Sequence, residues 1–320
     1  MYYVQSMLVS DTAEKIKKME IRGAGRIARA AVAALKARAD IAPSRDLSEY
    51  RKEMVTAADL LIATRPTAVS LPNAVHLVMR SLTLDTPSVS SAKEEFSRAC
   101  QDFIRSSENA IQRIGEVGAR HIRDGDVILT HCNSEAALEC LLTAHRKGVR
   151  FSVYATEVRP GNQGLLTIGT LNRAGIPTTY IVDSAVRYFM KEIDRVIVGA
   201  DAVSVNGAVV NKIGTSQIAL AAHEARTSFL VAAETYKFAP RTILGEYIEI
   251  EERASSEVLP DPIAKAHPFI TVRNPVFDVT PPEYVNLIVT EEGAIPPQMA
   301  YIILRDYLGW EIGDFEARTR

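Results

Sequence analysis

Apolar residues follow two different patterns along this chain of 320 residues. Up to about residue 122 they recur at helical spacing, as in the alanine-rich stretch 24–39 and in the proline-free stretch 91–122. Between these stretches, the sequence RPTAVSLPNA predicts a loop that opens a further helix at Ala74. We therefore expect residues 1–122 to form a helical N-terminal domain.

Residues 123–320 instead alternate short apolar runs with helical segments. Apolar runs without polar alternation are typical of parallel strands that helices cover on both faces. Strands are expected at 126–130, 151–156, 178–182, 195–200, 228–233 and 285–290, and helices at 134–147, 163–174 and 215–226. The predicted fold class is therefore α/β, and open sheets of this kind bind ligands at the carboxyl ends of their strands.

Composition narrows the range of functions. The formal net charge is -2, so nothing in the overall charge indicates nucleic acid or an acidic membrane as a partner. The three cysteines form no C-x-x-C pair, which argues against a disulfide framework or a zinc site and fits a reducing compartment. The N-terminus does not resemble a signal peptide, and no apolar stretch approaches membrane-spanning length. We expect a cytoplasmic protein.

Polar residues follow several of the predicted strands. Cys132 lies just after the run 126–130, Asp183 follows 178–182 and Asp201 follows 195–200. A further polar pair precedes the helix expected at 215, namely Asn211 and Lys212. Because the carboxyl ends of parallel strands share one edge of a sheet, these side chains predict a single polar crevice.

Cys132 lies just before a predicted helix whose N-cap is either Asn133 or Ser134. The positive end of a helix lowers the pKa of a thiol below its usual value of about 8.5, which would make Cys132 a base or nucleophile. The alternative is a small buried hydrophobic residue, and position alone does not decide between the two. Asp201 is likewise either a general acid or, as position alone favours, a turn residue.

Basic residues lie beside glycines or helix starts in five segments. Loops of this kind bind phosphate through backbone N–H groups and the helix dipole, so a substrate with two phosphates is indicated. The five residues are Arg22, Arg65, Arg159, Lys212 and Lys237. The segment GAGRIA at 23–28 matches a dinucleotide-binding pattern, but the stretch before it is charged and helical rather than an apolar strand. A nicotinamide cofactor is therefore not expected.

Seven segments occur in order over roughly residues 20 to 305: RGAG, TRPTAVSLPNA, THCNSEAAL, TEVRPGNQG, VGADAV, NGAVVNKIGT and VAAETYKF. This set resembles the superfamily shared by methylthioribose-1-phosphate isomerase, archaeal ribose-1,5-bisphosphate isomerase and the regulatory subunits of the translation initiation factor 2 exchange factor. The regulatory subunits typically lack the cysteine and usually carry Glu in place of Asp201. Methylthioribose-1-phosphate isomerases usually begin with RGAPAIG and end with an APTST-like segment.

The RGAGRIA and AETYKF segments are similar to the ribose-1,5-bisphosphate isomerase branch. This resemblance implies a helical N-terminal domain over residues 1–122 and a Rossmann-like domain over residues 123–320. It also implies an aldose-ketose isomerase that converts α-D-ribose 1,5-bisphosphate to D-ribulose 1,5-bisphosphate in AMP degradation, with no cofactor and no metal. A homo-oligomer, either a dimer or a trimer of dimers forming a hexamer, and AMP as activator are further implications. Methylthioribose-1-phosphate isomerase and a non-catalytic regulatory subunit remain the alternatives.

The resemblance also implies roles for single residues. Cys132 would take the proton from C2 of the opened sugar, and Asp201 would act as the acid. One group would bind phosphate: Arg22, Gly23, Ala24 and Gly25 as a loop, Arg65 as a second clamp and Lys237 for the remaining phosphate. Another group would lie beside the sugar: Ser134, Glu135 and Ala136 at a helix start, and Asn211 and Lys212 at hydroxyls or phosphate. The roles of Asn133, Arg159 and Asp183 stay open.

Overall fold

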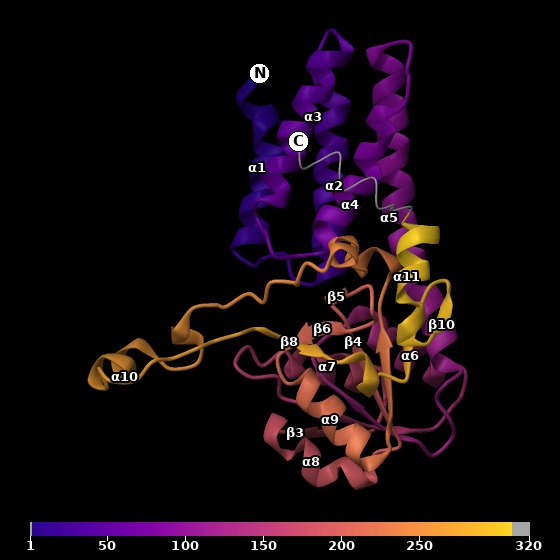
Figure 1. Cartoon of the computed structure of the whole chain (residues 1–320), viewed down its shortest axis with the longest axis vertical. Helices are drawn as coiled ribbons and strands as arrows, with labels where there is room; N and C mark the ends of the chain where they lie inside the picture. Colours follow the sequence, from indigo (N-terminus) through magenta and orange to yellow (C-terminus); the bar gives the residue numbers. More distant parts are fainter. Residues whose placement is uncertain (1, 309–320) are drawn as a thin grey trace. The chain divides into compact units, whose positions relative to one another are not determined.

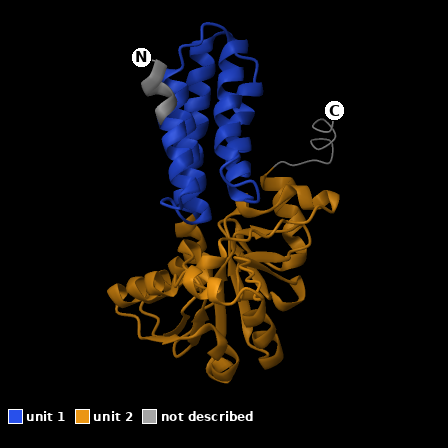
Figure 2. Ribbon diagram, turned by 90° about the vertical axis from the view of Figure 1, so that its left-hand side faces the viewer, with its two compact units in different colours: residues 1–110 blue, residues 111–320 orange. Residues whose placement is uncertain are grey.

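The computed structural model describes residues 2–308, with side chains from residue 8 onward. The chain forms two compact units, Met1–Ala110 and Ile111–Arg320, which are coloured separately in Figure 2 and are described one at a time below. The long helix α5 (Val89–Ala119) contributes to both units. A domain boundary at residue 122 therefore stays a prediction.

The first unit is helical, as its apolar spacing predicts. It contains α1 (Tyr2–Lys17), α2 (Ala24–Ile41), α3 (Leu47–Ile62), α4 (Ser70–Met79) and the first part of α5. The large side chains of Tyr50, Met54 and Phe96 are fully buried among these helices. The helical spacing in this part of the sequence thus corresponds to a real core.

Helix α4 begins at Ser70, so the expected start at Ala74 is wrong by one turn. Pro72 suggested a loop, but it falls within the first turn of the helix. Backbone N–H groups in that turn have no intrahelical partner, so a proline there removes no hydrogen bond.

The second unit is built on a seven-stranded sheet with the strand order β10-β9-β7-β4-β1-β2-β3. The six expected strands are all present and run parallel: β1 (Val127–Thr130), β2 (Ser152–Thr156), β3 (Thr178–Ile181), β4 (Arg195–Gly199), β7 (Ser228–Ala232) and β9 (Leu287–Thr290). The predicted α/β class with a mostly parallel sheet is confirmed. Only β10 (Gly293–Ile295) pairs antiparallel, at the edge.

The three expected helices of this unit are also present, as α6 (Glu135–Arg146), α7 (Gly164–Ala174) and α9 (Thr215–Ala225). Buried residues of the central strands, such as Ile128, Ile197 and Leu230, share one core cluster with Leu141 of α6. Figure 1 shows these helices lying against the sheet. The apolar runs are therefore buried strands, as their lack of alternation indicates.

The sequence did not predict a second, three-stranded sheet. It has the order β5-β6-β8 and pairs antiparallel, with β5 (Ala202–Val203), β6 (Val209–Lys212) and β8 (Phe277–Thr280). These strands have two to four residues, and polar residues interrupt or end the apolar runs of β6 and β8. β5 directly follows Asp201, and β6 contains Asn211 and Lys212, so this sheet supports part of the candidate site.

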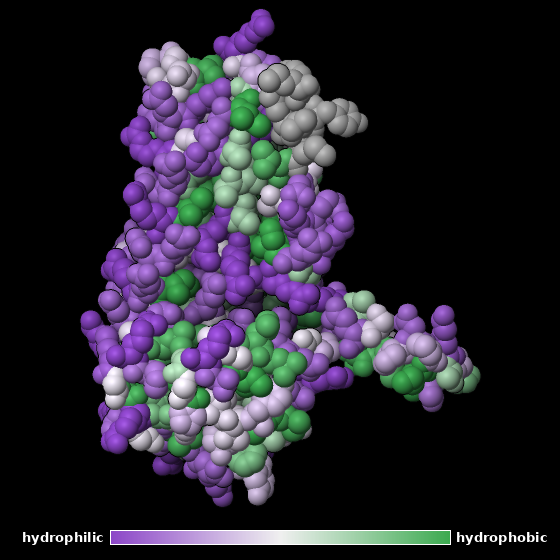
Figure 3. All heavy atoms as spheres, turned by 180° about the vertical axis from the view of Figure 1, so that it is seen from behind, coloured by the Kyte–Doolittle hydropathy of each residue, from purple (hydrophilic) through white to green (hydrophobic). Residues whose placement is uncertain are grey.

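A long arm, residues 246–275, extends from the second unit between Gly245 and Val276 (Figure 1). It includes α10 (Asp261–Ala266), and its base is closed by a bridge between Glu252 and Pro275. Tyr247 and Phe269 on the arm are almost completely exposed, and hydrophobic side chains are visible on its surface in Figure 3.

The remaining elements are short. They are α8 (Val186–Phe189), α11 (Ala300–Ile302), a π-helical turn at Ile303–Tyr307, and 3₁₀ turns at Arg80–Thr83, Asp183–Ala185, Met190–Glu192, Thr235–Lys237, Pro240–Leu244, Ser255–Glu257, Pro282–Tyr284 and Pro297–Met299. None of the helices within residues 2–308 combines the length and the apolar character needed to cross a bilayer.

Gly199, the last residue of β4, allows the start of α6 to approach the sheet. A Cβ atom at this position would overlap the Oγ and Cβ atoms of Ser134, the residue that caps α6. We expect Gly199→Ala to reduce the free energy of unfolding by about 1–3 kcal/mol, the usual cost of overpacking. Denaturant unfolding followed by circular dichroism measures this change.

Gly169→Ala is the matched control, because a Cβ atom there meets nothing closer than Arg173 Nη1 at 3.7 Å. Gly169 lies inside α7, so alanine should be neutral or stabilising by about 0.5–1 kcal/mol. Equal effects of the two substitutions would show that the contact with Ser134 is unimportant.

Candidate active site

Four predicted site residues of the second unit act on one another electrostatically. Cys132 follows β1 and Asp201 follows β4, while Lys212 ends β6 and Lys237 lies in the turn after β7. The charge of Asp201 raises the pKa of the Cys132 thiol, and the charges of Lys212 and Lys237 lower it. The structure thus brings these residues, from four strand ends, within electrostatic reach of Cys132.

The Cys132 thiol is protonated at neutral pH. Burial raises its pKa to about 11, which outweighs the opposing charge of Lys212. The expected lowering of this pKa by the helix end is therefore wrong, because the loss of hydration acts more strongly than the dipole. The thiol donates a hydrogen bond to Gln163 Oε1 at 3.1 Å.

The backbone at Cys132 is unusual, since its φ angle is 70°, in the left-handed region. Side chains other than glycine rarely adopt this conformation, and residues held there cluster at functional sites. Ser134, rather than Asn133, is the N-cap of α6, and its Oγ accepts a hydrogen bond from Ala137 N at 3.3 Å. Asn133 instead accepts a hydrogen bond from Thr167 Oγ1 through its Oδ1, at 3.3 Å.

His131, beside the cysteine, is a buried and neutral structural residue. Its Nε2 lies 2.9 Å from the carbonyl oxygen of Ile213, so Nε2 carries the hydrogen, and Nδ1 accepts from Thr156 Oγ1 at 2.6 Å. Burial lowers the pKa of His131, and the nearby charge of Asp183 only partly opposes this.

Asp183 supports the loop that follows β2. Its two carboxylate oxygens accept hydrogen bonds from the backbone N–H groups of Val158 and Arg159, at 2.9 and 2.8 Å. The arginine side chain itself is exposed. Asp183 therefore has a structural function in this loop, which also carries Gln163.

Lys237 is almost fully buried and forms an ion pair with Glu234, with Nζ 2.6 Å from Oε2. Burial alone would lower the pKa of Lys237, but Glu234 more than compensates, and Asp201 and Glu135 raise the pKa further. The hydroxyl of Tyr236 donates to Glu234 Oε1 at 3.0 Å. Lys237 is therefore a fixed, buried cation near Asp201 and Cys132, and its carboxylate partner is a residue that the sequence did not reveal.

Asn211 and Lys212 are both buried at the end of β6. The Lys212 ammonium lies 4.8 Å from the centre of the Phe277 ring, a cation–π contact. Asn211 Nδ2 donates to Thr215 Oγ1 at 3.0 Å, so part of this side chain holds the following turn. At the start of α6, Glu135 is close enough to influence Lys237, and Ala136 is buried.

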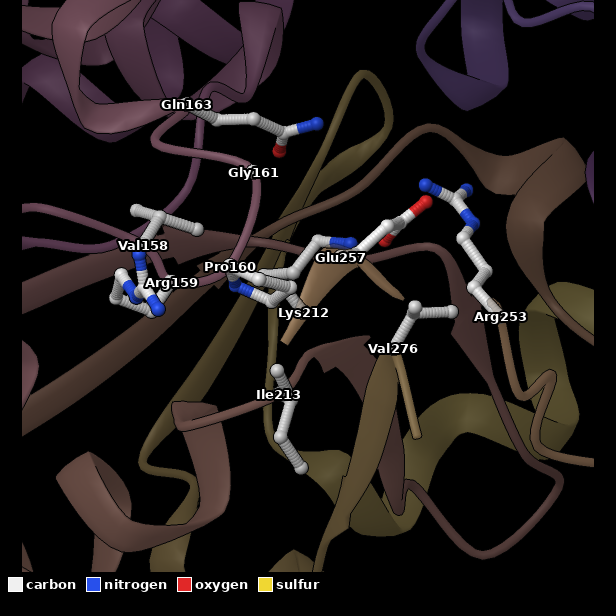
Figure 4. A pocket seen from close by; sticks show the side chains of 10 residues that line it. All are labelled: Val158, Arg159, Pro160, Gly161, Gln163, Lys212, Ile213, Arg253, Glu257 and Val276. Carbon is white, nitrogen blue, oxygen red and sulfur yellow. The ribbon is translucent and has the colours of Figure 1, made fainter. Parts of the chain in front are cut away.

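A small hollow adjoins the cysteine, because it is lined by Gln163, whose Oε1 accepts the hydrogen bond of the Cys132 thiol. The side chains of Lys212, Arg253 and Glu257 point into it (Figure 4). Gln163 belongs to the RPGNQG segment. From the sequence, only Arg159 of this segment was proposed as a site residue, and Gln163 was overlooked. Arg253 and Glu257 come from the base of the arm, where no motif indicated a site.

The predicted phosphate loop belongs to the first unit. Gly23, with φ 91°, precedes α2 as its N-cap and supplies no side-chain cap. Arg22 Nε donates to the carbonyl oxygen of Met19 at 2.6 Å, and Arg65 Nη1 lies 3.6 Å from Met19 Sδ. Ala24 accepts a hydrogen bond from Ser70 Oγ through its carbonyl oxygen, and Gly25 is buried in the first turn. Both arginines thus contact Met19, close to the N-terminus of α2.

Comparison with known proteins identifies the family. The family model for the initiation factor 2 subunit family matches residues 20–297. The chain belongs to this family. A protein of Methanocaldococcus jannaschii named ribose 1,5-bisphosphate isomerase is 54% identical over 303 residues, which are 95% of this chain and 96% of the relative.

Two further relatives represent the neighbouring branches. A protein of Pelotomaculum thermopropionicum named methylthioribose-1-phosphate isomerase is 37% identical over 92% of this chain and 85% of its own length. The crystal structure of a Pyrococcus horikoshii OT3 protein described as translation initiation factor eIF-2B has a TM-score of 0.76 and 32% identity, over 90% of this chain and 97% of that chain. All three branches that the sequence motifs resemble are therefore found among the relatives of this family member.

The high pKa of Cys132 predicts slow alkylation. At pH 7.5 the rate with iodoacetamide should be roughly two orders of magnitude below that of free cysteine, because little thiolate is present. The rate should also rise about tenfold per pH unit up to pH 9.5, without a plateau. Mass spectrometry after cleavage at glutamate, which cuts at Glu135 and Glu139, puts Cys132 on a peptide of its own and separates its reaction from those of the buried Cys100 and Cys140. A plateau near pH 8 would contradict the role of burial.

Proposed function

We propose that this family member is an isomerase that converts α-D-ribose 1,5-bisphosphate to D-ribulose 1,5-bisphosphate. The observation that carries the proposal is the crevice in which Cys132 and Asp201 lie within electrostatic reach of one another and of two buried lysines. The 54% identity to a relative that bears this name supports the choice of substrate. Fixed cations in a site shielded from water suit a reaction that develops negative charge on a phosphorylated sugar.

The proposed mechanism begins with a proton moving from the Cys132 thiol to Asp201. This transfer removes the negative charge that raises the pKa of the thiol, and it leaves Lys212 and Lys237 to stabilise the thiolate. Asp201 then donates its proton to the ring oxygen as the bond between C1 and that oxygen breaks. The thiolate takes the proton from C2, which gives a phosphoenol intermediate.

The second half of the reaction restores both residues. The Cys132 thiol returns its proton to C1, and Asp201 takes the proton of the C2 hydroxyl as the ketone forms. A proton then moves back from Asp201 to the Cys132 thiolate, so each catalytic group returns to its starting protonation state. The net change moves hydrogen from C2 to C1 and from the C2 hydroxyl to the former ring oxygen. The intermediate must be kept from water because it could otherwise lose phosphate, which is consistent with the buried charges of the crevice.

Phosphate-binding residues are proposed in each unit, taken separately. In the second unit, Lys237, Lys212 and Asn211 are proposed to bind phosphate or hydroxyl groups, with Ser134, Glu135 and Ala136 beside the sugar. In the first unit, we propose that Arg22, Gly23, Ala24, Gly25 and Arg65 bind phosphate at the start of α2. The backbone N–H groups of a helix N-terminus and two arginines are a chemically suitable combination for this task.

The strand order supports describing the second unit as Rossmann-like. Read from β3, the parallel strands follow the order 3-2-1-4-5-6 when counted along the chain, which is the order of doubly wound dinucleotide-binding sheets. The further implications of the sequence resemblance, namely a dimer or hexamer, activation by AMP, a part in AMP degradation and a cytoplasmic location, remain predictions.

The proposal is tested by mixing the purified protein with α-ribose 1,5-bisphosphate and trapping ribulose 1,5-bisphosphate with a carboxylase, with and without AMP. We expect turnover by the wild type and a loss of at least about 10³-fold in kcat for Cys132→Ser and for Asp201→Asn, since each removes a proton-transfer group. Cys100→Ser and Asp194→Asn are matched controls, because Cys100 lies in the first unit and Asp194 accepts a backbone hydrogen bond from Val127.

The controls should keep wild-type rates. Unchanged kcat in either Cys132→Ser or Asp201→Asn would rule out the mechanism. Turnover of methylthioribose 1-phosphate in place of the bisphosphate would move the protein to the neighbouring isomerase branch, and turnover of neither substrate would favour a binding subunit.

Substitution of Lys237 tests whether the protein binds a substrate with one phosphate or with two. Lys237→Gln alone leaves Glu234 buried and unpaired, which should cost about 3–5 kcal/mol of stability. The double variant Lys237→Gln/Glu234→Gln removes both charges and should recover most of that loss in a denaturant titration. If Lys237 binds phosphate, both variants should raise KM for ribose 1,5-bisphosphate at least tenfold. Recovery of KM together with stability would show that the lysine only balances a buried carboxylate.

A further inference from the structure

Asp278 holds the turn between β6 and α9 from the neighbouring strand. It lies on β8, directly opposite Asn211 in the register of the small sheet. Its Oδ2 accepts a hydrogen bond from Gly214 N at 2.8 Å, and both carboxylate oxygens lie 3.1 Å from Ser216 N. Burial raises the pKa of Asp278 to about 6, against the opposite effect of these hydrogen bonds, so the group is ionised at neutral pH.

The same turn carries groups of the candidate active site. Lys212 immediately precedes it, and the carbonyl oxygen of Lys212 accepts a hydrogen bond from Thr215 Oγ1 at 2.6 Å. The carbonyl oxygen of Ile213 accepts from Nε2 of His131, the residue beside Cys132. The turn therefore fixes the start of the lysine side chain and also supports the segment that carries the cysteine.

The turn has little freedom to adjust. Gly214 has a φ angle of 102°, and a Cβ atom there would come within 3.2 Å of the His131 ring. The His131 ring lies on one side of the turn, and the Asp278 carboxylate accepts hydrogen bonds from the N–H groups of Gly214 and Ser216. Because Phe277, next to Asp278, contacts the Lys212 ammonium, residues of β8 contact both the backbone and the side chain of this segment.

We propose that Asp278 is a positioning residue for the isomerase reaction, which holds the 211–216 turn so that Lys212 is presented to the substrate. The inference rests on the proposed function, because it assigns to Lys212 a contact with a phosphate or hydroxyl group. Asp278 itself touches no reacting atom. Its effect is transmitted through two backbone N–H groups to Lys212, which is proposed both to bind the substrate and to stabilise the Cys132 thiolate, so it should appear in KM and in kcat.

Asp278→Asn is the first test, since it keeps the size of the side chain but offers one acceptor oxygen to two N–H donors. We expect KM for ribose 1,5-bisphosphate to rise about tenfold and kcat to fall about threefold to tenfold, because Lys212 both binds the substrate and stabilises the Cys132 thiolate. Gly214→Ala disturbs the same turn without changing the carboxylate and should give the same changes. Asp46→Ala is the control, because Asp46 caps α3 in the first unit by accepting from Glu49 N, and kcat and KM should stay unchanged.

A double-variant cycle separates positioning from a purely structural function. In a Lys212→Met background, Asp278→Asn should cause no further rise in KM, because the group that it positions is already absent. The inference would be overturned if the effects of Asp278→Asn and Lys212→Met on KM were fully additive. It would also be overturned by a wild-type KM in folded Asp278→Asn, or if both turn variants failed to fold while Asp46→Ala folded. Absence of wild-type turnover would overturn the proposed function and the inference with it, whereas wild-type turnover with an unchanged KM in the variants would overturn the inference alone.

Discussion

Hydrogen bonding between parallel strands in a fixed register is the constraint on which the candidate site depends. Thr130 at the end of β1 is paired with Ala155, and Gly199 at the end of β4 is paired with Ala232 of β7. The strands therefore end at the same edge, and the segments that carry Cys132, Asp201 and Lys237 leave the sheet together. A slip of one residue in a strand would turn its side chains to the opposite face and separate these groups.

Burial has opposite consequences for the charged and the neutral groups of this crevice. It raises the pKa of Cys132, so the thiol keeps its proton at neutral pH. The same low dielectric strengthens the attraction between Lys237 and Glu234, so both stay ionised. The candidate site thus contains a stable cation near a weakly acidic thiol, and the thiol depends on its neighbours for activation.

The sequence predicted the large elements of the fold, and it proposed site residues that the structure brings near one another. The parallel strands were predictable because most of them are largely buried apolar runs, although β3 is partly exposed. Cys132, Asp201 and Lys212 were proposed because they lie at strand ends or before a helix. The strands β5, β6 and β8 were not predictable, because pairing between short and distant segments leaves no periodic pattern.

The parts of the site that depend on long-range contacts could not be found from local patterns. Glu234 precedes the predicted Lys237 by three residues, yet nothing in the sequence shows that both are buried and paired. Asp278 lies about 65 residues beyond the turn that it holds, and only the pairing of β8 with β6 brings the two together. The pKa of Cys132 was wrongly expected because the helix end is visible in the sequence, whereas the depth of burial is not.

The left-handed backbone at Cys132 means that the residue best for stability differs from the residue that the proposed chemistry needs. A glycine would adopt this conformation without the steric penalty of about 1–2 kcal/mol that a side chain incurs there. Selection for stability alone would therefore favour glycine at residue 132, and selection for a thiol would oppose it. If a descendant of this protein lost its catalytic activity but kept its fold, replacing Cys132 by glycine would increase its free energy of unfolding.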